Sequence, residues 1–166
     1  LAKVTEAASL EEALRDEDQH GFDVARVTRD AVESIARTVT SLRWVTDIPE
    51  TPISVLGNDL RFEQMLDKLL DNASDFTTEG GVITVGLSDH INSVVLWVEN
   101  EGPSLHIQDG VDAFQMFSGT RNDSTGSHLG LGLYVVRLIA ESMGARVAIG
   151  NTQRGVRVEV TEIRVP

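Results

Sequence analysis

The chain has 166 residues, of which 41% are hydrophobic, so it is long enough for one domain with a substantial core and too short to favour two. Its formal net charge is -12, from 26 acidic and 14 basic side chains without a basic run, and this disfavours nucleic acid as a partner. The lack of cysteine excludes disulfides and cysteine-based zinc sites, and no stretch approaches the roughly 20 apolar residues of a membrane-spanning helix.

The first half of the chain predicts helices with short β-rich pieces between them. Apolar residues at helical spacing predict a helix over 1–18, whose apolar stripe needs a partner surface. A second helix is expected over 25–38, followed by strands at 42–48 and 53–56 and a helix over 59–75. Because the first helical pattern is already in progress at Leu1, we expect the chain to be a piece of a longer protein.

The second half contains most of the predicted strands. They cover residues 81–88, 93–100, 145–149 and 156–163. A polar, glycine-bearing loop over 101–130 precedes a strongly apolar helix over 131–143. Strands gathered in this way and separated by helices predict a two-layer α/β sandwich, with a mixed sheet covered on one face by helices.

The helix over 59–75 carries a polar amide close to its end. On a wheel of 100° per residue, Asn72 falls between the apolar face and the charged face. An amide oxygen at such a border can coordinate Mg²⁺, which takes only one or two protein oxygens beside water and phosphate oxygens. This helix alone leaves a second interpretation open, a solvated residue near a helix end.

Two glycine-bearing stretches follow in positions where a backbone must turn tightly or approach a ligand. VENEGPSL (98–105) comes directly off a predicted strand, and HLGLGLYVV (128–136) opens a helix. GLGLYV (130–135) lacks the third glycine of a dinucleotide fingerprint, and GNTQRGVR (150–157) lacks the Lys-Ser/Thr of a P-loop. Each stretch taken singly is typical of turn chemistry.

Taken in order, four segments resemble the nucleotide-binding boxes of bacterial sensor histidine kinases, members of the GHKL superfamily with DNA gyrase and MutL. QMLDKLLDNASDFT (64–77) is similar to the N box and VENEGPSL to the first glycine box. AFQMFS (113–118) is similar to the F box, and HLGLGLYVVRLIAE (128–141) to the second glycine box. Within this family, the sequences DKLLDNASDF (67–76) and HLGLGLYVVRLIAE (128–141) are similar to those of the histidine kinases of proteobacterial dedicated sortase systems.

The resemblance covers about residues 22–166 and implies a division of the chain. Residues 21–166 would form the ATP-binding catalytic domain, with the GHKL histidine kinase ATPase fold. Residues 1–20 would be the end of the second dimerisation helix. No histidine stands in the H-E/D-x-x-T/N-P setting of the family's phosphoacceptor, so we expect the acceptor outside this chain.

The resemblance also implies roles for individual residues. Asn72 would ligate the Mg²⁺ that bridges the ATP phosphates, and Phe76 would pack on the adenine. Asn100 stands where an Asp usually receives the adenine amino group, and its amide oxygen can still accept that hydrogen bond. Gly102 would let the loop pass close to the base. Residues 118–128 would form a lid over the nucleotide.

At the start of the last helix, backbone N–H groups would meet the phosphates, assisted by the positive end of the helix dipole. The residues that the resemblance assigns to this contact are His128, Leu129, Gly130, Leu131 and Gly132.

The chain departs from the family in the charges around the site. Asp75 stands where Lys or Arg often follows the metal-binding Asn, and Ser104 replaces a common glycine. Lys68 occupies the position of the general base that gyrase-type members use to activate water, which disfavours efficient hydrolysis without an acceptor. We hypothesise that Lys68 or Arg121 supplies the missing positive charge to the phosphates.

These expectations combine into one predicted function: binding of Mg-ATP and transfer of its γ-phosphate to a histidine on a dimerisation domain outside this chain. Its own dimerisation domain and a response regulator would be the partners. The full protein would be a homodimer anchored in the inner membrane, with this portion in the cytoplasm. Two alternatives stay open: a GHKL ATP-binding regulatory module of the anti-sigma or serine-kinase type, and a degenerate interaction domain.

The Lys68→Ala and Arg121→Ala variants test the source of the positive charge. The variant that loses a charge-assisted phosphate contact is expected to bind ATP about tenfold more weakly in calorimetry. Wild-type affinity in both variants would remove both candidates.

Overall fold

The structure is a computed structural model, and it describes residues 2–105 and 127–166. In chain order its elements are α1 (Ala2–Arg15), β1 (His20–Asp23), α2 (Val24–Thr38), β2 (Arg43–Asp47), β3 (Ser54–Gly57), α3 (Asp59–Phe76), β4 (Val82–Asp89), β5 (Ser93–Glu101), α4 (Ser127–Ser142), β6 (Arg146–Asn151) and β7 (Gly155–Arg164). None of the helices in these two ranges has the length and apolar content needed to cross a membrane.

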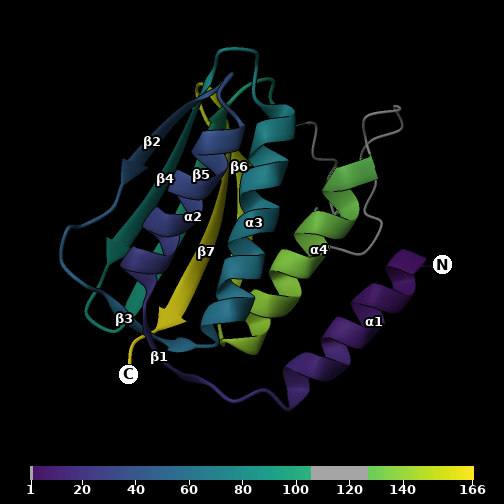
Figure 1. The fold of residues 1–166 in the computed structure, drawn as a ribbon, viewed down its shortest axis with the longest axis vertical. Coiled ribbons are helices and arrows are strands. Elements are labelled where there is room, and N and C mark those ends of the chain that lie inside the picture. The colour runs from purple at the N-terminus through teal and green to yellow at the C-terminus, as the bar shows by residue number, and fades with distance from the viewer. Residues whose placement is uncertain (1, 106–126) are drawn as a thin grey trace.

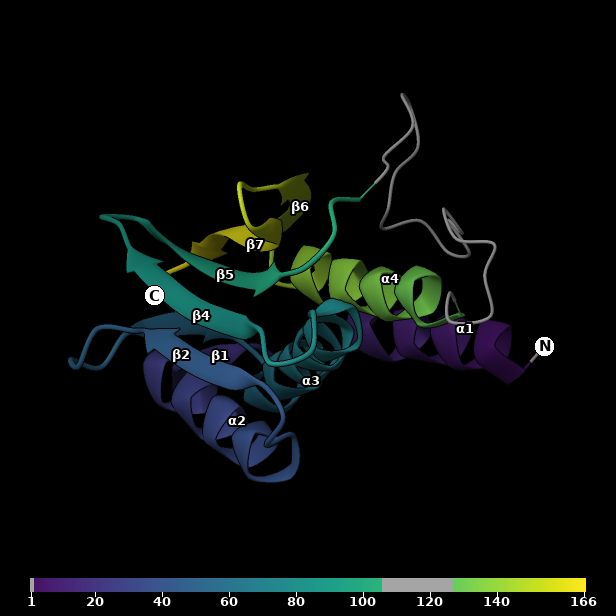
Figure 2. The same cartoon turned by 90° about the horizontal axis from the view of Figure 1, so that it is seen from above.

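The predicted two-layer α/β sandwich is confirmed. One layer is a five-stranded sheet in the order β2-β4-β5-β7-β6, in which β2 pairs with β4 in parallel and the other neighbours are antiparallel. The helices lie together on one face of this sheet (Figures 1 and 2). Side chains alternate across the sheet, so that Val94, Leu96, Val98 and Asn100 of β5 are all buried.

The apolar face of α3 fills the space between the sheet and the neighbouring helices. The predicted face is buried, and its members are Phe62, Leu66, Leu69, Leu70 and Ala73. Met65 is completely buried as well, because α3 is covered by α4 in addition to the sheet. At its start, the side chain of Asn58 accepts a hydrogen bond from the Arg61 N–H at 3.1 Å, a standard N-cap.

A small second sheet was not predicted. β1 pairs antiparallel with β3, with Phe22 opposite Val55. The sequence HGFD has no alternation that would indicate a strand, so this strand depends on its tertiary partner. Asp23 then caps α2 through the Ala25 N–H and also accepts from the Ile53 N–H, both at 3.1 Å, which ties β1 and α2 to the segment before β3.

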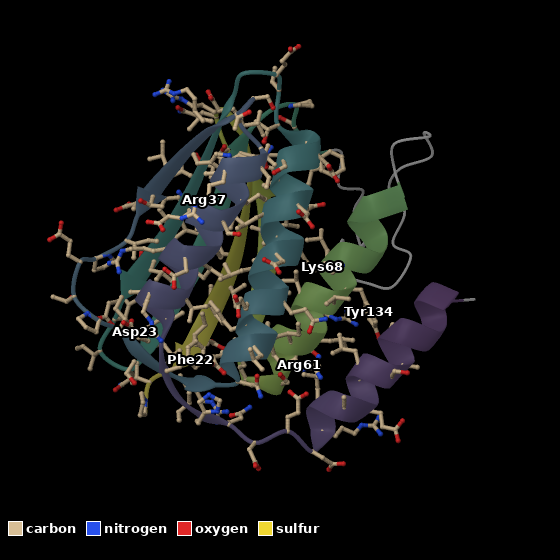
Figure 3. All side chains as sticks on the ribbon, in the orientation of Figure 1. Phe22, Asp23, Arg37, Arg61, Lys68 and Tyr134 are labelled. Carbon is tan, nitrogen blue, oxygen red and sulfur yellow. The ribbon has the colours of Figure 1, made fainter. Side chains whose placement is uncertain are left out.

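α1 packs against α4 through buried Ala7 and Leu10, so the apolar stripe expected there does have a partner surface (Figure 1). The segment that follows is held by polar contacts. Glu17 accepts a hydrogen bond from the Arg61 Nε at 2.7 Å, and Gln19 accepts one from Arg164 at 3.1 Å. Figure 3 shows Arg61 on the side of α3 that is turned toward α1.

The ends of β5 and β7 approach each other so closely that only glycine fits. A Cβ added to Gly155 would lie 1.9 Å from the Asn100 carbonyl oxygen and 2.8 Å from the Gly102 nitrogen. Backbone atoms cannot move aside as the end of a flexible side chain can, so a side chain here must displace a strand.

We therefore expect Gly155→Ala to destabilise the domain by about 2 kcal/mol or more in urea unfolding. Gly150→Ala is the matched control, because a Cβ on Gly150 meets nothing within 4 Å and is expected to change stability by less than about 0.5 kcal/mol. Equal effects of the two substitutions would contradict this account of the strand crossing.

Candidate functional site

The last turns of α3 bring Asn72 and Phe76 to one end of the helical layer. The Ser74 hydroxyl donates to the Leu70 carbonyl at 2.8 Å, and the Thr77 hydroxyl donates to that of Ala73, so local side chains occupy carbonyls near the helix end. Figure 1 shows α4 antiparallel to α3, with its first turn at this same end. The negative end of one helix dipole therefore lies beside the positive end of another.

Asn72 carries a buried polar atom in the last turns of α3. Asn72 is partly buried, and its Oδ1 is buried without a hydrogen-bond partner in the part of the chain that the structure describes. Leaving a buried acceptor unpaired costs roughly 1–3 kcal/mol, a cost that a ligand for this oxygen would offset. The amide oxygen is thus a fitting ligand for a hard cation brought in with phosphate oxygens.

The described residues do not form a metal site from protein groups alone. Within the described ranges, no group of three or more His, Asp or Glu side chains is arranged to hold a metal ion. A cation at Asn72 would need most of its ligands from water and from a bound phosphate. That is the usual coordination of Mg²⁺ at nucleotide phosphates.

Asn100 is the second buried amide of the site. It is 7% exposed and lies on the helix-covered face of the sheet, at the end of β5. Its Nδ2 is buried and has no hydrogen-bond partner within the described ranges. A Cβ on Gly102 would lie 3.4 Å from this Nδ2, so the amide is placed directly beside the loop that leaves β5.

Backbone contacts bring these two parts of the site together. A Cβ on Gly102 would lie only 2.4 Å from the Phe76 carbonyl oxygen, so the end of α3 and the first loop residue after β5 are nearly in contact. The Thr78 N–H donates to the Glu101 carbonyl at 3.0 Å, and the Gly102 N–H donates to that of Arg154. The structure therefore assembles Phe76, Asn100 and Gly102, with Asn72 one helical turn away.

Glu101 holds this junction with its side chain. Its Oε1 accepts a hydrogen bond from the Val82 N–H at 2.8 Å, at the start of β4. The pairing of β4 with β5 ends at Ile83 and Asn100, one residue short of Val82. The Glu101 carboxylate therefore pairs the Val82 N–H, which has no backbone partner on β5. Glu101 thus links the loop after α3 to the end of β5.

Lys68 lies one turn before Asn72 and is exposed, on the α4 side of α3 (Figure 3). Four acids at spacing i+4 run along the exposed side of the same helix: Glu63, Asp67, Asp71 and Asp75. Burial chiefly, and then the charge of Asp71, raise the pKa of the Asp67 carboxyl, while Lys68 lowers it. Lys68 therefore already compensates a local excess of negative charge, and a role at phosphate stays a prediction.

The remaining predicted site residues belong to α4 and the loop before it. The helix starts at Ser127, earlier than the expected 131. This places His128, Leu129 and Gly130 in its first turn, and Leu131 and Gly132 in its second. A Cβ on Gly132 would meet no atom within 4 Å, so there is open space beside the helix at this point. Arg121 and the F box (113–118) lie outside the described residues, as does most of the expected lid.

The chain matches the model of a known protein family. Residues 57–166 match the model of the histidine kinase-, DNA gyrase B- and HSP90-like ATPases. The chain belongs to this family. The matched range begins just before α3 and contains every proposed site residue.

The individual relatives belong to one class within this family, the sensor kinases. The chain is 30% identical over 98% of its length to the sensor histidine kinase TrcS of Mycobacterium tuberculosis, and 29% identical over 91% to the sensor protein ChvG of Agrobacterium fabrum. It spans only 32% and 27% of those two proteins. The solved structure of the histidine kinase AdeS of Acinetobacter baumannii superposes with a TM-score of 0.76, at 23% identity, over 99% of this chain and 77% of that one.

These comparisons confirm the expected ATP-binding catalytic module of the histidine kinase type. The finer resemblance to kinases of dedicated sortase systems stays a prediction. Sequence reasoning missed Glu101 and Gly155 as parts of the site. A signal for Glu101 was present in the sequence, since it stands between Asn100 and Gly102, whereas Gly155 gave none, because its partner atoms belong to another strand.

We expect Glu101→Ala to cost about 1–2 kcal/mol of stability in urea unfolding, because the Val82 N–H loses a charged acceptor. Glu101→Gln keeps an acceptor oxygen at the same place and is expected to recover at least half of that loss. A Gln variant as unstable as the Ala variant would contradict the role of this hydrogen bond.

Proposed function

We propose that this chain binds Mg-ATP at the junction of α3, β5 and α4 and positions the γ-phosphate for transfer to a histidine of a dimerisation domain outside the chain. The observation that carries the proposal is the buried Oδ1 of Asn72, which has no hydrogen-bond partner among the described residues and stands near the end of the helix that resembles the family's N box. The Mg²⁺ would neutralise developing charge on the phosphates.

Each residue of the site has a task in this proposal. Asn72 ligates the metal, and Phe76 packs on the base. Asn100 hydrogen-bonds the base edge, and Gly102 leaves room for it. The first turns of α4, with Gly130 and Gly132, turn backbone N–H groups and a positive dipole end toward the phosphates, which helps a chain of net charge -12 to bind an anion.

The relatives favour histidine as the acceptor over the serine-kinase alternative, since they are sensor histidine kinases. The partners in the proposal are accordingly the protein's own dimerisation domain and a response regulator. The full protein would act as a homodimer anchored in the inner membrane, with this domain in the cytoplasm. Residues 1–20 would be the end of the second dimerisation helix, and residues 21–166 the catalytic domain.

The experiment is calorimetric binding of Mg-ATP to the wild type and to Asn72→Ala. We expect the variant to lose at least tenfold in affinity, because a metal ligand is removed, while the dependence of binding on Mg²⁺ weakens. Asn92→Ala, in the exposed turn between β4 and β5, is the matched control and is expected to bind as the wild type does. Equal affinity of Asn72→Ala and the wild type would contradict the proposal.

A further inference from the structure

We propose that Asn100 lets the site accept 6-oxopurine nucleotides as well as adenine nucleotides. The inference rests on the function proposed above, since it concerns the base edge of the same site. It names Asn100 as the residue that sets purine selectivity.

Asn100 is buried and has a hydrogen-bond donor that no described residue pairs, which is the state expected of a side chain that binds a ligand. Asn100 is only 7% exposed at the end of β5, and its Nδ2 has no hydrogen-bond partner among the residues that the structure describes. Its neighbour Glu101 directs its carboxylate to the Val82 N–H, away from this amide. No described residue accepts a hydrogen bond from Nδ2. In the described part of the domain, no hydrogen bond of this nitrogen therefore selects one of the two orientations of the amide.

The chemistry of an amide differs from that of a carboxylate at one point. A carboxamide presents one donor and one acceptor side by side, whereas an ionised carboxylate only accepts. Adenine presents a donor at its 6-amino group beside an acceptor at N1. Hypoxanthine and guanine present the reverse, an acceptor at O6 beside a donor at N1.

It follows that an amide matches both kinds of edge, because a half-turn about its terminal bond exchanges donor and acceptor. A carboxylate in the same buried position can accept a hydrogen bond from the adenine amino group. With a 6-oxopurine, its negatively charged oxygen would instead lie against the O6 atom, which is also a hydrogen-bond acceptor, and the two would repel each other. Sites that hydrogen-bond a substrate group reject the analogue with the wrong pattern strongly, because the buried groups are then left unpaired.

The test compares binding of Mg-ATP and Mg-ITP to the whole chain by calorimetry, since inosine differs from adenosine at this edge alone. We expect the wild type to bind Mg-ITP within about tenfold of Mg-ATP. Asn100→Asp is expected to raise the preference for ATP over ITP by at least tenfold. Asn92→Asp introduces the same charge in an exposed turn and is expected to leave the preference unchanged.

A wild type that rejects Mg-ITP as strongly as Asn100→Asp does would overturn the inference and leave the proposed function intact. Failure of the wild type to bind either nucleotide would overturn both. Thermal unfolding of each variant checks that the buried carboxylate is tolerated. Should Asn100→Asp not fold, the ratio of the two wild-type affinities decides alone.

Discussion

The site depends on one close crossing of backbones at the end of the sheet. A Cβ on Gly102 would lie 2.4 Å from the Phe76 carbonyl oxygen, and a Cβ on Gly155 would lie 1.9 Å from the Asn100 carbonyl oxygen. The end of α3, the end of β5 and the start of β7 therefore leave no room for a side chain at either glycine. Glu101 adds a hydrogen bond from its carboxylate to the start of β4. Through these contacts two amides from different elements, Asn72 and Asn100, are held at the same end of the domain.

Both amides have a buried polar atom without a hydrogen-bond partner among residues 2–105 and 127–166. Protein interiors avoid such atoms because they cost free energy without return, and where they occur at a site they indicate a partner supplied from outside. Each of the two suits a different part of a nucleotide, an oxygen for the metal at the phosphates and a nitrogen for the base. The exposed side of α3 carries Asp67, Asp71 and Asp75, so in the proposed site a bound cation and the backbone dipoles of α4 would offset part of the negative charge of the phosphates.

Local sequence pattern was sufficient for much of this fold. The apolar stripe of α3 follows from burial on one face and was predicted from periodicity, and the strands β4, β5, β6 and β7 were expected close to their observed ranges. β1 was missed because its four residues have no pattern of their own and are ordered by pairing with β3. The full burial of Met65, the start of α4 at Ser127 and the need for glycine at 155 depend on neighbours distant in the sequence, which periodicity cannot supply. For the site, residue identity pointed to Asn72 and Asn100, whereas their unpaired buried atoms became visible only in three dimensions.

The most direct test of the account is a crystal structure of this chain with Mg²⁺ and a non-hydrolysable ATP analogue. The account predicts the Asn72 Oδ1 at about 2.1 Å from the metal, with the base edge on the Asn100 amide. A nucleotide bound with its metal ligated elsewhere, and with the Asn72 oxygen still without a partner, would contradict it.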